Sequence, residues 1–527
     1  MNTADTKRSW HDEIFYHIYP LGFCGAPPEN TGERQHSSAR PRIRRIEDAI
    51  PHILDLGCSA VYLGPLLESS RHGYDTADYF RCDRRLGSNE DLELLVDRLH
   101  DAGLRVVLDG VFNHVGRDFH AFRDLLEHGA SSDKVDWFKN INFDQSSPEG
   151  DPFSYSGWEG NFDLVELNLD NREVREHLFA AVCWMIEEIK VDGLRLDVAY
   201  SLPQEFLREL RIVADQALSR RTGRPGEAGT HDGETSRFFL LGEVIHGDYG
   251  SYVTDDLLDS VTNYECYKGL WSSHNDANYH EIAHSLDRQF AAGGISENVP
   301  LYNFVDNHDV DRVASVLENV RHLFPLYGLL FTIPGMPSVY YGSELAVPGK
   351  KGDGNDAALR PPWIAIGELQ DPEIGEALRD FVAELASIRT GAPELRHGAF
   401  ETVHVADEQF VYLRRSQGRE AVVVVAVNAS GEPATVEAGL SSLPASGEDG
   451  GGRAAGETGR APGETGRAPG ETGRAGDHPE GESGGGEPEA ELESLFFDRR
   501  RTPVTGGRAT IELPAYGVYI ARATPAR

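Results

Sequence analysis

The chain has 527 residues, of which 39% are hydrophobic, so it can form one large domain with a smaller one beside it. Its formal net charge is −36, and only seven of its 50 basic residues are lysine. Nucleic acids and anionic membranes bind positively charged protein faces, so this balance excludes both as expected partners and favours a neutral substrate. We interpret the acidic excess as a solvated surface, with a salt-rich or acid-tolerant host as the alternative.

Five dispersed cysteines, without a CxxC pair, are typical of reduced thiols in a cytosolic protein. The start "MNTADTKRSWHDEIFYHIYP" lacks a basic segment followed by an apolar run, so no signal peptide is expected. No apolar run reaches transmembrane length. These features predict a cytoplasmic protein.

Strand-like and helix-like segments alternate along most of the chain. The apolar segments that predict strands are 13–19, 60–64, 105–111, 193–198, 237–244, 261–266, 301–307 and 338–342. Helical patterns lie between them, for example at 89–103 and 171–190. Eight such strands predict an α/β fold with a parallel sheet closed into a (β/α)8 TIM barrel. A doubly wound open sheet is the alternative, and the absence of a GxGxxG turn weighs against it.

Two regions depart from this alternation. Residues 115–165 are polar, aromatic and too long for an ordinary loop, which predicts a small insertion domain after the third strand. The barrel is then expected over 1–114 and 166–397. Residues 398–527 predict a C-terminal antiparallel β-sandwich domain. The repeated unit APGETGR within it predicts a disordered low-complexity insert at about 445–491.

Polar and charged side chains follow four of the predicted strands. They are Asp109 with Asn113 and His114, Arg195 with Asp197, Glu243, and Asp306 with His308 and Asp309. A single Asp after a strand is usually a helix cap or a turn residue. In a barrel, however, the carboxyl ends of the strands surround one catalytic pocket. The four positions together therefore predict an active site.

The stretch "GLRLDVAY", at 193–200, carries a charge pair on one face of a strand. Period-2 alternation places Arg195 and Asp197 on the same side. In an open sheet this would be an awkward buried ion pair. At the mouth of a barrel it fits an active-site carboxylate beside a cation that keeps it ionised.

The four segments resemble, in order and spacing, the four short sequence regions of the α-amylase family, glycoside hydrolase family 13. The matching stretches are "DGVFNH", "GLRLDVA", "GEV" and "FVDNHD". Together with the three-part layout, the resemblance covers nearly the whole chain except the repeat insert. It implies a retaining α-glucan hydrolase that cleaves α-1,4 bonds in maltooligosaccharides or cyclodextrins by double displacement.

The resemblance also implies a role for each matching residue. Asp197 would be the nucleophile, Glu243 the general acid/base and Asp309 the third carboxylate, which holds sugar hydroxyls. Arg195 would keep the nucleophile ionised. Tyr74, Asp75, His114, His308 and Arg360 would bind the substrate. The apolar run before Glu243 would help raise the pKa of this acid.

The segment "LVELN" at 164–168 is nearest to the version found in cyclomaltodextrinases, neopullulanases and maltogenic amylases. Many of that group carry an N-terminal β domain that forms a dimer. Here the first barrel strand is expected by about residue 13, so that domain is predicted to be absent and the oligomeric state stays open. The expected partner is an α-glucan oligosaccharide.

No cofactor is expected to be required, and calcium is the one metal candidate. Asn113 matches a position that ligates calcium in many amylases. Within the same family, a transglycosylase or isomerase is the alternative function. From another class, the chain could be a non-catalytic amylase-like carbohydrate-binding protein, although such relatives typically lose a catalytic carboxylate.

Overall fold

The computed structural model describes residues 9–31, 40–223, 237–352, 356–369, 371–416, 418, 421–440, 488–496 and 498–525. One sheet of eight parallel strands forms its centre, in the order β11-β10-β9-β5-β2-β1-β13-β12. A parallel bridge between Thr262 and Tyr302 joins the two outer strands and closes the sheet. The predicted barrel is therefore confirmed, and the open-sheet alternative is wrong.

The barrel strands are short. They are β1 (Phe15–Ile18), β2 (Ala60–Leu63), β5 (Arg105–Gly110), β9 (Gly193–Leu196), β10 (Phe239–Gly242), β11 (Ser260–Val261), β12 (Tyr302–Phe304) and β13 (Met336–Tyr340). One prediction fails at its boundaries: the segment 261–266 is mostly not strand. β11 ends at Val261, because the Asn263 side chain accepts a 3.1 Å hydrogen bond from the Cys266 N–H and caps α8, which begins at Tyr264.

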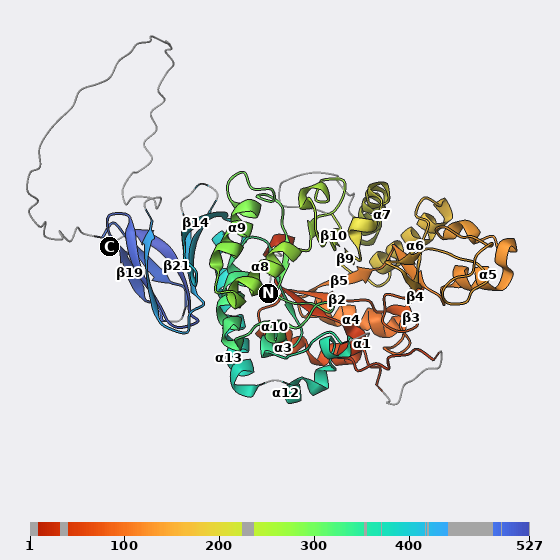
Figure 1. Ribbon diagram of the computed structural model, residues 1–527, viewed down its shortest axis with the longest axis horizontal. Coiled ribbons are helices and arrows are strands. Elements are labelled where there is room, and N and C mark those ends of the chain that lie inside the picture. Colours follow the sequence, from red (N-terminus) through yellow and green to blue (C-terminus); the bar gives the residue numbers. More distant parts are fainter. Residues whose placement is uncertain are drawn as a thin grey trace, which may run out of the picture.

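Helices surround the strands (Figure 1). The longer ones are α4 (Asn89–Asp101), α6 (Arg172–Glu187), α7 (Gln204–Thr222), α8 (Tyr264–Asn275), α9 (Tyr279–Phe290), α11 (Leu323–Thr332) and α13 (Pro372–Gly391). α4 and α6 confirm the helices expected at 89–103 and 171–190. α4 starts with a capping box, in which Ser88 and Asp91 each accept a bond from the backbone of the other.

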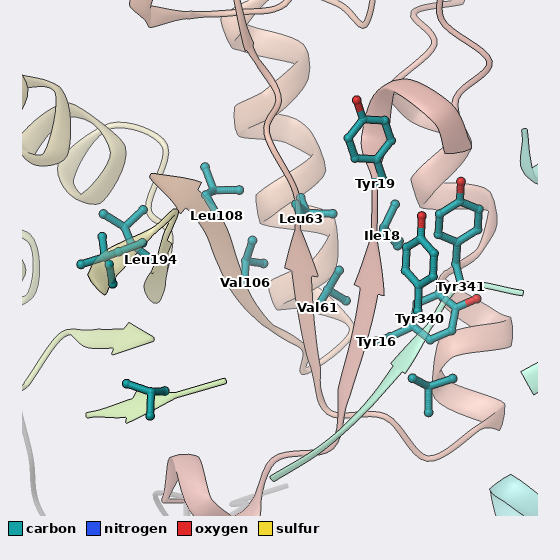
Figure 2. Close-up of a cluster of buried hydrophobic side chains, with 14 of the residues drawn as sticks. Tyr16, Ile18, Tyr19, Val61, Leu63, Val106, Leu108, Leu194, Tyr340 and Tyr341 are labelled. Carbon is teal, nitrogen blue, oxygen red and sulfur yellow. The ribbon is translucent and has the colours of Figure 1, made fainter. Parts of the chain in front are cut away.

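Alternate strand residues build two separate cores, because successive side chains point to opposite faces of a strand. One set packs against the helices. Figure 2 shows part of it on three neighbouring strands, with Ile18, Val61, Leu63, Val106 and Leu108. All five side chains are buried.

The other set fills the barrel. It comprises Phe15, Ala60, Tyr62, Val107, Phe239, Leu241, Tyr302, Phe304 and Met336. Trp10 stacks on Phe239 with ring centroids 4.1 Å apart, before the first strand. The amino-terminal end of the barrel is therefore apolar, and the inward-facing charged residues lie toward the carboxyl ends of the strands.

Two small sheets extend the barrel beyond its carboxyl ends. β3 (Leu67–Ser69) pairs with β4 (Thr76–Cys82) after the second barrel strand. After β5, the strands β6 (His114–Gly116), β7 (Gly157–Trp158) and β8 (Asn161–Glu166) form a sheet in the order β6-β8-β7, together with α5 (His120–His128). This is the predicted insertion, and its sheet starts and ends one residue outside the expected range 115–165.

The C-terminal region is an antiparallel sandwich, as predicted. Its strands are β14 (Ala399–Val405), β15 (Gln409–Arg415), β16 (Val422–Asn428), β17 (Ala434–Gly439), β18 (Ala490–Ser494), β19 (Arg501–Val504), β20 (Arg508–Leu513) and β21 (Val518–Pro525). A six-stranded sheet, β14-β15-β16-β21-β18-β19, shares a buried apolar cluster with the pair β17-β20. Figure 1 shows these sheets at the end of the molecule opposite α5.

Most of the predicted low-complexity insert at about 445–491 lies outside the described residues, and its last two residues belong to β18. All five cysteines lie in the described part and are free thiols, four of them buried. Of the helices in the described ranges, none combines the length and the apolarity needed to cross a membrane.

Candidate active site

One guanidinium group joins three carboxylates at the carboxyl ends of the strands. Arg195 pairs in register with Asp109 on the neighbouring strand β5. Its Nη1 donates hydrogen bonds of 2.9 Å to Oδ1 of Asp109 and to Oδ1 of Asp197. Its Nη2 lies 2.7 Å from Oε1 of Glu243. All four side chains are buried, so these residues, far apart in the sequence, form one ionic cluster.

Glu243 is also fixed by two neutral donors. The backbone N–H of Val198 donates to its Oε2 at 3.0 Å, and the Tyr264 hydroxyl donates to its Oε1 at 3.2 Å. Val198 has φ 43° and ψ 46°, a left-handed conformation that is rare for a β-branched residue. The chain thus turns sharply after Asp197, and the next N–H reaches Glu243. Backbone strain of this kind is typical of functional sites.

Asp109 is held by two tyrosines as well as by Arg195. The Tyr62 hydroxyl donates to its Oδ2 at 2.9 Å and the Tyr74 hydroxyl at 3.1 Å. Tyr74 also stacks on His308, with ring centroids 5.5 Å apart and an interplanar angle of 9°, and its hydroxyl contacts His308 Nε2. Tyr74 therefore connects the carboxylate cluster to the loop after β12.

Asp309 lies on the more open side of the site, with a side chain 36% exposed. Arg360 Nη2 donates to its Oδ1 at 3.0 Å, and His308 Nε2 lies 2.9 Å from its Oδ2. Arg360 also donates to the His308 carbonyl at 3.0 Å and covers the ring of Tyr19 at 4.4 Å. The structure thus brings Tyr74, His308, Asp309 and Arg360 together.

His114 and Asp75 lie at the edge of the cluster. His114 is buried, its Nε2 is 3.9 Å from Oδ2 of Asp197, and its ring stacks on Trp158 with centroids 5.9 Å apart. Asp75 Oδ1 accepts hydrogen bonds of 3.1 Å from the backbone N–H groups of His72 and Gly73. In the described contacts Asp75 braces the loop that carries Tyr74 and makes no bond to the carboxylate cluster.

The electrostatics of the site follow from its burial and its charge count. Burial raises the pKa of Asp197, with Glu243 and Asp109 adding to the effect and Arg195 opposing it. Burial would also raise the pKa of Asp309, but His308 and Arg360 lower it well below its usual value. Four carboxylates face the guanidinium groups of Arg195 and Arg360, so negative charge is in excess. This excess favours a proton retained on one carboxylate.

Burial has the opposite effect on the basic groups. It lowers the pKa of His114 to about 3, so this histidine is neutral near pH 7. Burial alone would lower the pKa of Arg195 too, but Asp109 and Glu243 raise it well above its usual value. Arg195 is therefore a permanent cation, and His114 next to Asp197 is an uncharged neighbour.

The residues around Asn113 offer no carboxylate cage for a metal ion. Asn113 is buried, and its carbonyl oxygen accepts a 3.0 Å bond from the Leu167 N–H. Among the described residues, no group of three or more His, Cys, Asp or Glu side chains is arranged to hold a metal. Calcium prefers several oxygen ligands, usually including carboxylates. Calcium at Asn113 stays a prediction.

Sequence reasoning did not identify Tyr62, Tyr264 or the N–H of Val198 as parts of the site. Tyr62 and Tyr264 both follow the strand-end rule, since Tyr62 is near the end of β2 and Tyr264 comes just after β11. Their positions at strand ends could have identified both tyrosines as site residues from the sequence. The contact of Val198 with Glu243 depends on a backbone turn that no local pattern predicts.

Comparisons with known proteins identify the family of the chain. The family model "Alpha amylase, catalytic domain" matches residues 18–390. A cyclomaltodextrinase from Geobacillus thermopakistaniensis is 30% identical over 444 residues, which is 81% of this chain and 70% of that protein.

Neopullulanase 2 from Thermoactinomyces vulgaris is 30% identical over 462 residues, or 84% of this chain and 73% of the relative. A solved cyclomaltodextrinase structure has a similar fold, with a TM-score of 0.73 at 24% identity, over 98% of this chain and 78% of that one. With more than half of its length matched by the family model and the carboxylates gathered at the strand ends, the chain belongs to the α-amylase family of glycoside hydrolases.

Proposed function

We propose that the protein is a retaining α-glucan hydrolase that cleaves α-1,4 bonds in short maltooligosaccharides or cyclodextrins. The observation that carries this proposal is Arg195, which binds Asp109, Asp197 and Glu243 at once. Retaining glycosidases need two carboxyl groups about 5–5.5 Å apart. Two carboxylates on adjacent nitrogens of one guanidinium group are near enough for this chemistry.

In the first step, an oxygen of Asp197 attacks the anomeric carbon, and Glu243 donates a proton to the departing glycosidic oxygen. The product is a glycosyl ester on Asp197 and a free sugar. In the second step, Glu243 takes a proton from water, the water oxygen attacks the same carbon, and Asp197 is released as a carboxylate. The two inversions retain the anomeric configuration.

Other residues bind and orient the sugar in this proposal. Asp309, held ionised by His308 and Arg360, accepts hydrogen bonds from hydroxyl groups. Tyr74 offers an aromatic face, and the neutral His114 beside Asp197 donates or accepts one bond without adding charge. Two relatives, a cyclomaltodextrinase and a neopullulanase, support this substrate class. A cytoplasmic location stays a prediction.

The test incubates the full-length protein with cyclodextrins, maltotriose, pullulan, isomaltose and trehalose and resolves the products. We expect glucose and maltose from maltotriose and cyclodextrins, released first as the α-anomer in a proton NMR time course. Asp197→Asn, which is similar in shape, should show no turnover. Release of the β-anomer, or full activity of Asp197→Asn, would refute the mechanism. Longer glucans in place of glucose and maltose would identify a transglycosylase, and isomerised trehalose an isomerase.

A further inference from the structure

The two oxygens of the Glu243 carboxyl group have different surroundings. Oε1 lies 2.7 Å from Nη2 of Arg195 and accepts a 3.2 Å hydrogen bond from the Tyr264 hydroxyl. Oε2 accepts one bond, of 3.0 Å, from the backbone N–H of Val198. A carboxyl oxygen has two lone pairs. Among the contacts of the described residues, both positions on Oε1 are therefore filled, and one position on Oε2 is open.

The direction of the bond between Tyr264 and Glu243 is decided by Asn307. A hydroxyl can donate or accept, so this contact alone does not show which group provides the hydrogen. Asn307 Oδ1 accepts a 2.8 Å bond from the backbone N–H of Asp309, which can only donate. The other end of the amide, Nδ2, therefore faces the Tyr264 hydroxyl and donates to it at 3.1 Å. The hydroxyl accepts from Asn307 and gives its own hydrogen to Glu243.

Tyr264 is held in place and stays protonated. It begins α8, which the Asn263 side chain caps, and its ring packs edge to face on Phe304 with centroids 4.9 Å apart. Burial raises the pKa of Tyr264 well above its usual value, and Glu243 and Asp309 add to the effect. The hydroxyl therefore keeps its hydrogen near pH 7 and remains a donor.

Resting on the proposed function, in which Glu243 is the general acid, we infer that Asn307 and Tyr264 are positioning residues that keep the catalytic proton on Oε2 of Glu243. A proton on Oε1 would meet the hydrogens that Arg195 and Tyr264 already direct at this oxygen. A proton on Oε2 takes the open position and leaves the bond from Val198 intact.

The first reaction step then has a defined donor atom. The bond between Oε2 of Glu243 and its hydrogen breaks, and the proton passes to the glycosidic oxygen. That oxygen keeps the electron pair of the broken C–O bond, while Asp197 supplies the electron pair of the new bond to carbon. Asn307 and Tyr264 touch neither the substrate nor the reacting atoms in this step, and they act through Glu243.

Several other titratable groups face Glu243, and none of them changes in the variants below. They are His17 on β1, Asp109 on β5, Arg195 and Asp197 at the end of β9, Tyr200 after them and His308 after β12. The Tyr264 hydroxyl stabilises the ionised carboxylate, because a donor binds a charged acceptor more strongly than a neutral one. Without this hydroxyl, Glu243 should keep its proton to a higher pH.

The experiment measures kcat/KM over a series of pH values on two substrates. Maltotetraose needs a proton on its leaving oxygen, whereas α-glucosyl fluoride releases fluoride without one. For Tyr264→Phe, which keeps the ring, we expect the basic limb of the maltotetraose profile to move up by about one pH unit, for the loss of one bond to a charged group. At the optimum, kcat/KM should fall about tenfold on maltotetraose and stay within about twofold on α-glucosyl fluoride.

A second variant tests the role of the amide. Asn307→Leu is similar in shape but leaves the Tyr264 hydroxyl free to rotate, so the proton is shared between the two oxygens of Glu243. We expect about a tenfold loss on maltotetraose and little change on α-glucosyl fluoride. Because both residues act through one hydroxyl, the double variant should lose no more than Tyr264→Phe alone, whereas independent effects would multiply to about 100-fold.

Tyr267→Phe is the matched control. It removes a hydroxyl from the same helix, one turn after Tyr264. In the described contacts, Tyr267 stacks on Phe304 with centroids 5.2 Å apart and makes no bond to Glu243. This variant should keep the pH profile and both rates. Activity on α-glucosyl fluoride shows that each variant is folded.

The inference would be overturned, with the proposed function left standing, by an unchanged pH profile in Tyr264→Phe, by equal losses on both substrates, by multiplying effects in the double variant, or by an equal effect of Tyr267→Phe. The pH profile of Tyr264→Phe decides the matter even where Asn307→Leu does not fold. Failure of the unmodified protein to cleave either substrate would overturn both the proposed function and the inference.

Discussion

The backbone N–H of Val198 donates a 3.0 Å hydrogen bond to Oε2 of Glu243. Val198 follows Asp197 directly and reaches this bond only in a left-handed conformation. The proposed nucleophile and the proposed acid are therefore linked through one strained peptide unit. A shift of the chain after β9 would move both groups, so their separation is controlled by the local backbone of a single loop.

Replacing the proposed acid should separate the two steps of the reaction. Glu243→Gln keeps an oxygen that accepts from Val198 but has no proton to give, so we expect kcat/KM on maltotetraose to fall about 10²–10⁴-fold. With α-glucosyl fluoride, whose leaving group needs no proton, added azide should restore turnover, because azide attacks without a base. Release of fluoride and reducing sugar measures both rates. Equal loss on both substrates, with no effect of azide, would contradict the assigned role.

Asp109 should affect the rate of catalysis although it is not expected to touch the reacting atoms. It anchors Arg195 with two bonds and accepts from Tyr62 and Tyr74. In Asp109→Asn, Arg195 loses an anionic partner and shifts toward Asp197 and Glu243. We expect kcat to fall about 10–100-fold with little change in KM, and the acid limb of the pH–rate profile to move, because the charge balance of the cluster changes. A variant with altered KM alone would contradict a positioning role.

The buried histidines should make the protein sensitive to mild acid. Burial lowers the pKa of His274 to about 3, whereas the unfolded chain titrates near its ordinary value. Between these two values the unfolded state binds more protons, so the free energy of unfolding falls as the pH falls below about 6.5. In His274→Gln the melting temperature should fall less between pH 6.5 and 4.5 than in the unmodified protein. Parallel curves for the two proteins would contradict this.

Arg414 joins the sandwich to the barrel, and among the residues that the structure describes it has no carboxylate partner. It lies on β15, is fully buried, and donates to the backbone carbonyls of Thr332, Leu395 and Gly398 at 2.6 to 3.2 Å. Burial lowers its pKa to about 10.

Arg414→Met fills similar space but leaves these carbonyls without a donor, so we expect a loss of about 3 kcal/mol in the free energy of unfolding. Urea unfolding followed by circular dichroism measures it, and Arg379→Met on the exposed side of α13 should have no effect. An equal stability of the two variants would contradict the role of Arg414.

The fold was predictable because the barrel strands carry apolar residues that neighbouring segments do not share. Val106 and Leu108 face the helices and Val107 faces the barrel interior, so their run is visible in the sequence. The sixth strand was not predictable in its bounds. Tyr264 looks like a strand residue close to Val261 and Thr262, but the Asn263 side chain starts a helix. A single capping bond outweighed the β-propensity of its neighbours.

Within the candidate site, the residues that the sequence itself indicated are those with a charge at a strand end, whereas Tyr74 and Arg360 were predicted from the family resemblance. Arg195, Asp197, Glu243 and Asp309 gave that signal. Trp158 gave none, because its neighbour His114 is 44 positions away and they meet only through the sheet in which β8 pairs with both β6 and β7. The contact of Tyr62 with Asp109 likewise gave no signal, because it depends on how their two strands are aligned.

The closure of the barrel has a consequence for how heat inactivates the protein. β11 has only two residues. A single bridge, between Thr262 and Tyr302, joins this part of the barrel to β12. Fewer backbone bonds hold this pair than any other neighbouring pair of the barrel strands, so it needs the least free energy to separate. Tyr264, which contacts Glu243, follows that bridge closely. We therefore expect enzymatic activity to be lost at a lower temperature than helical structure.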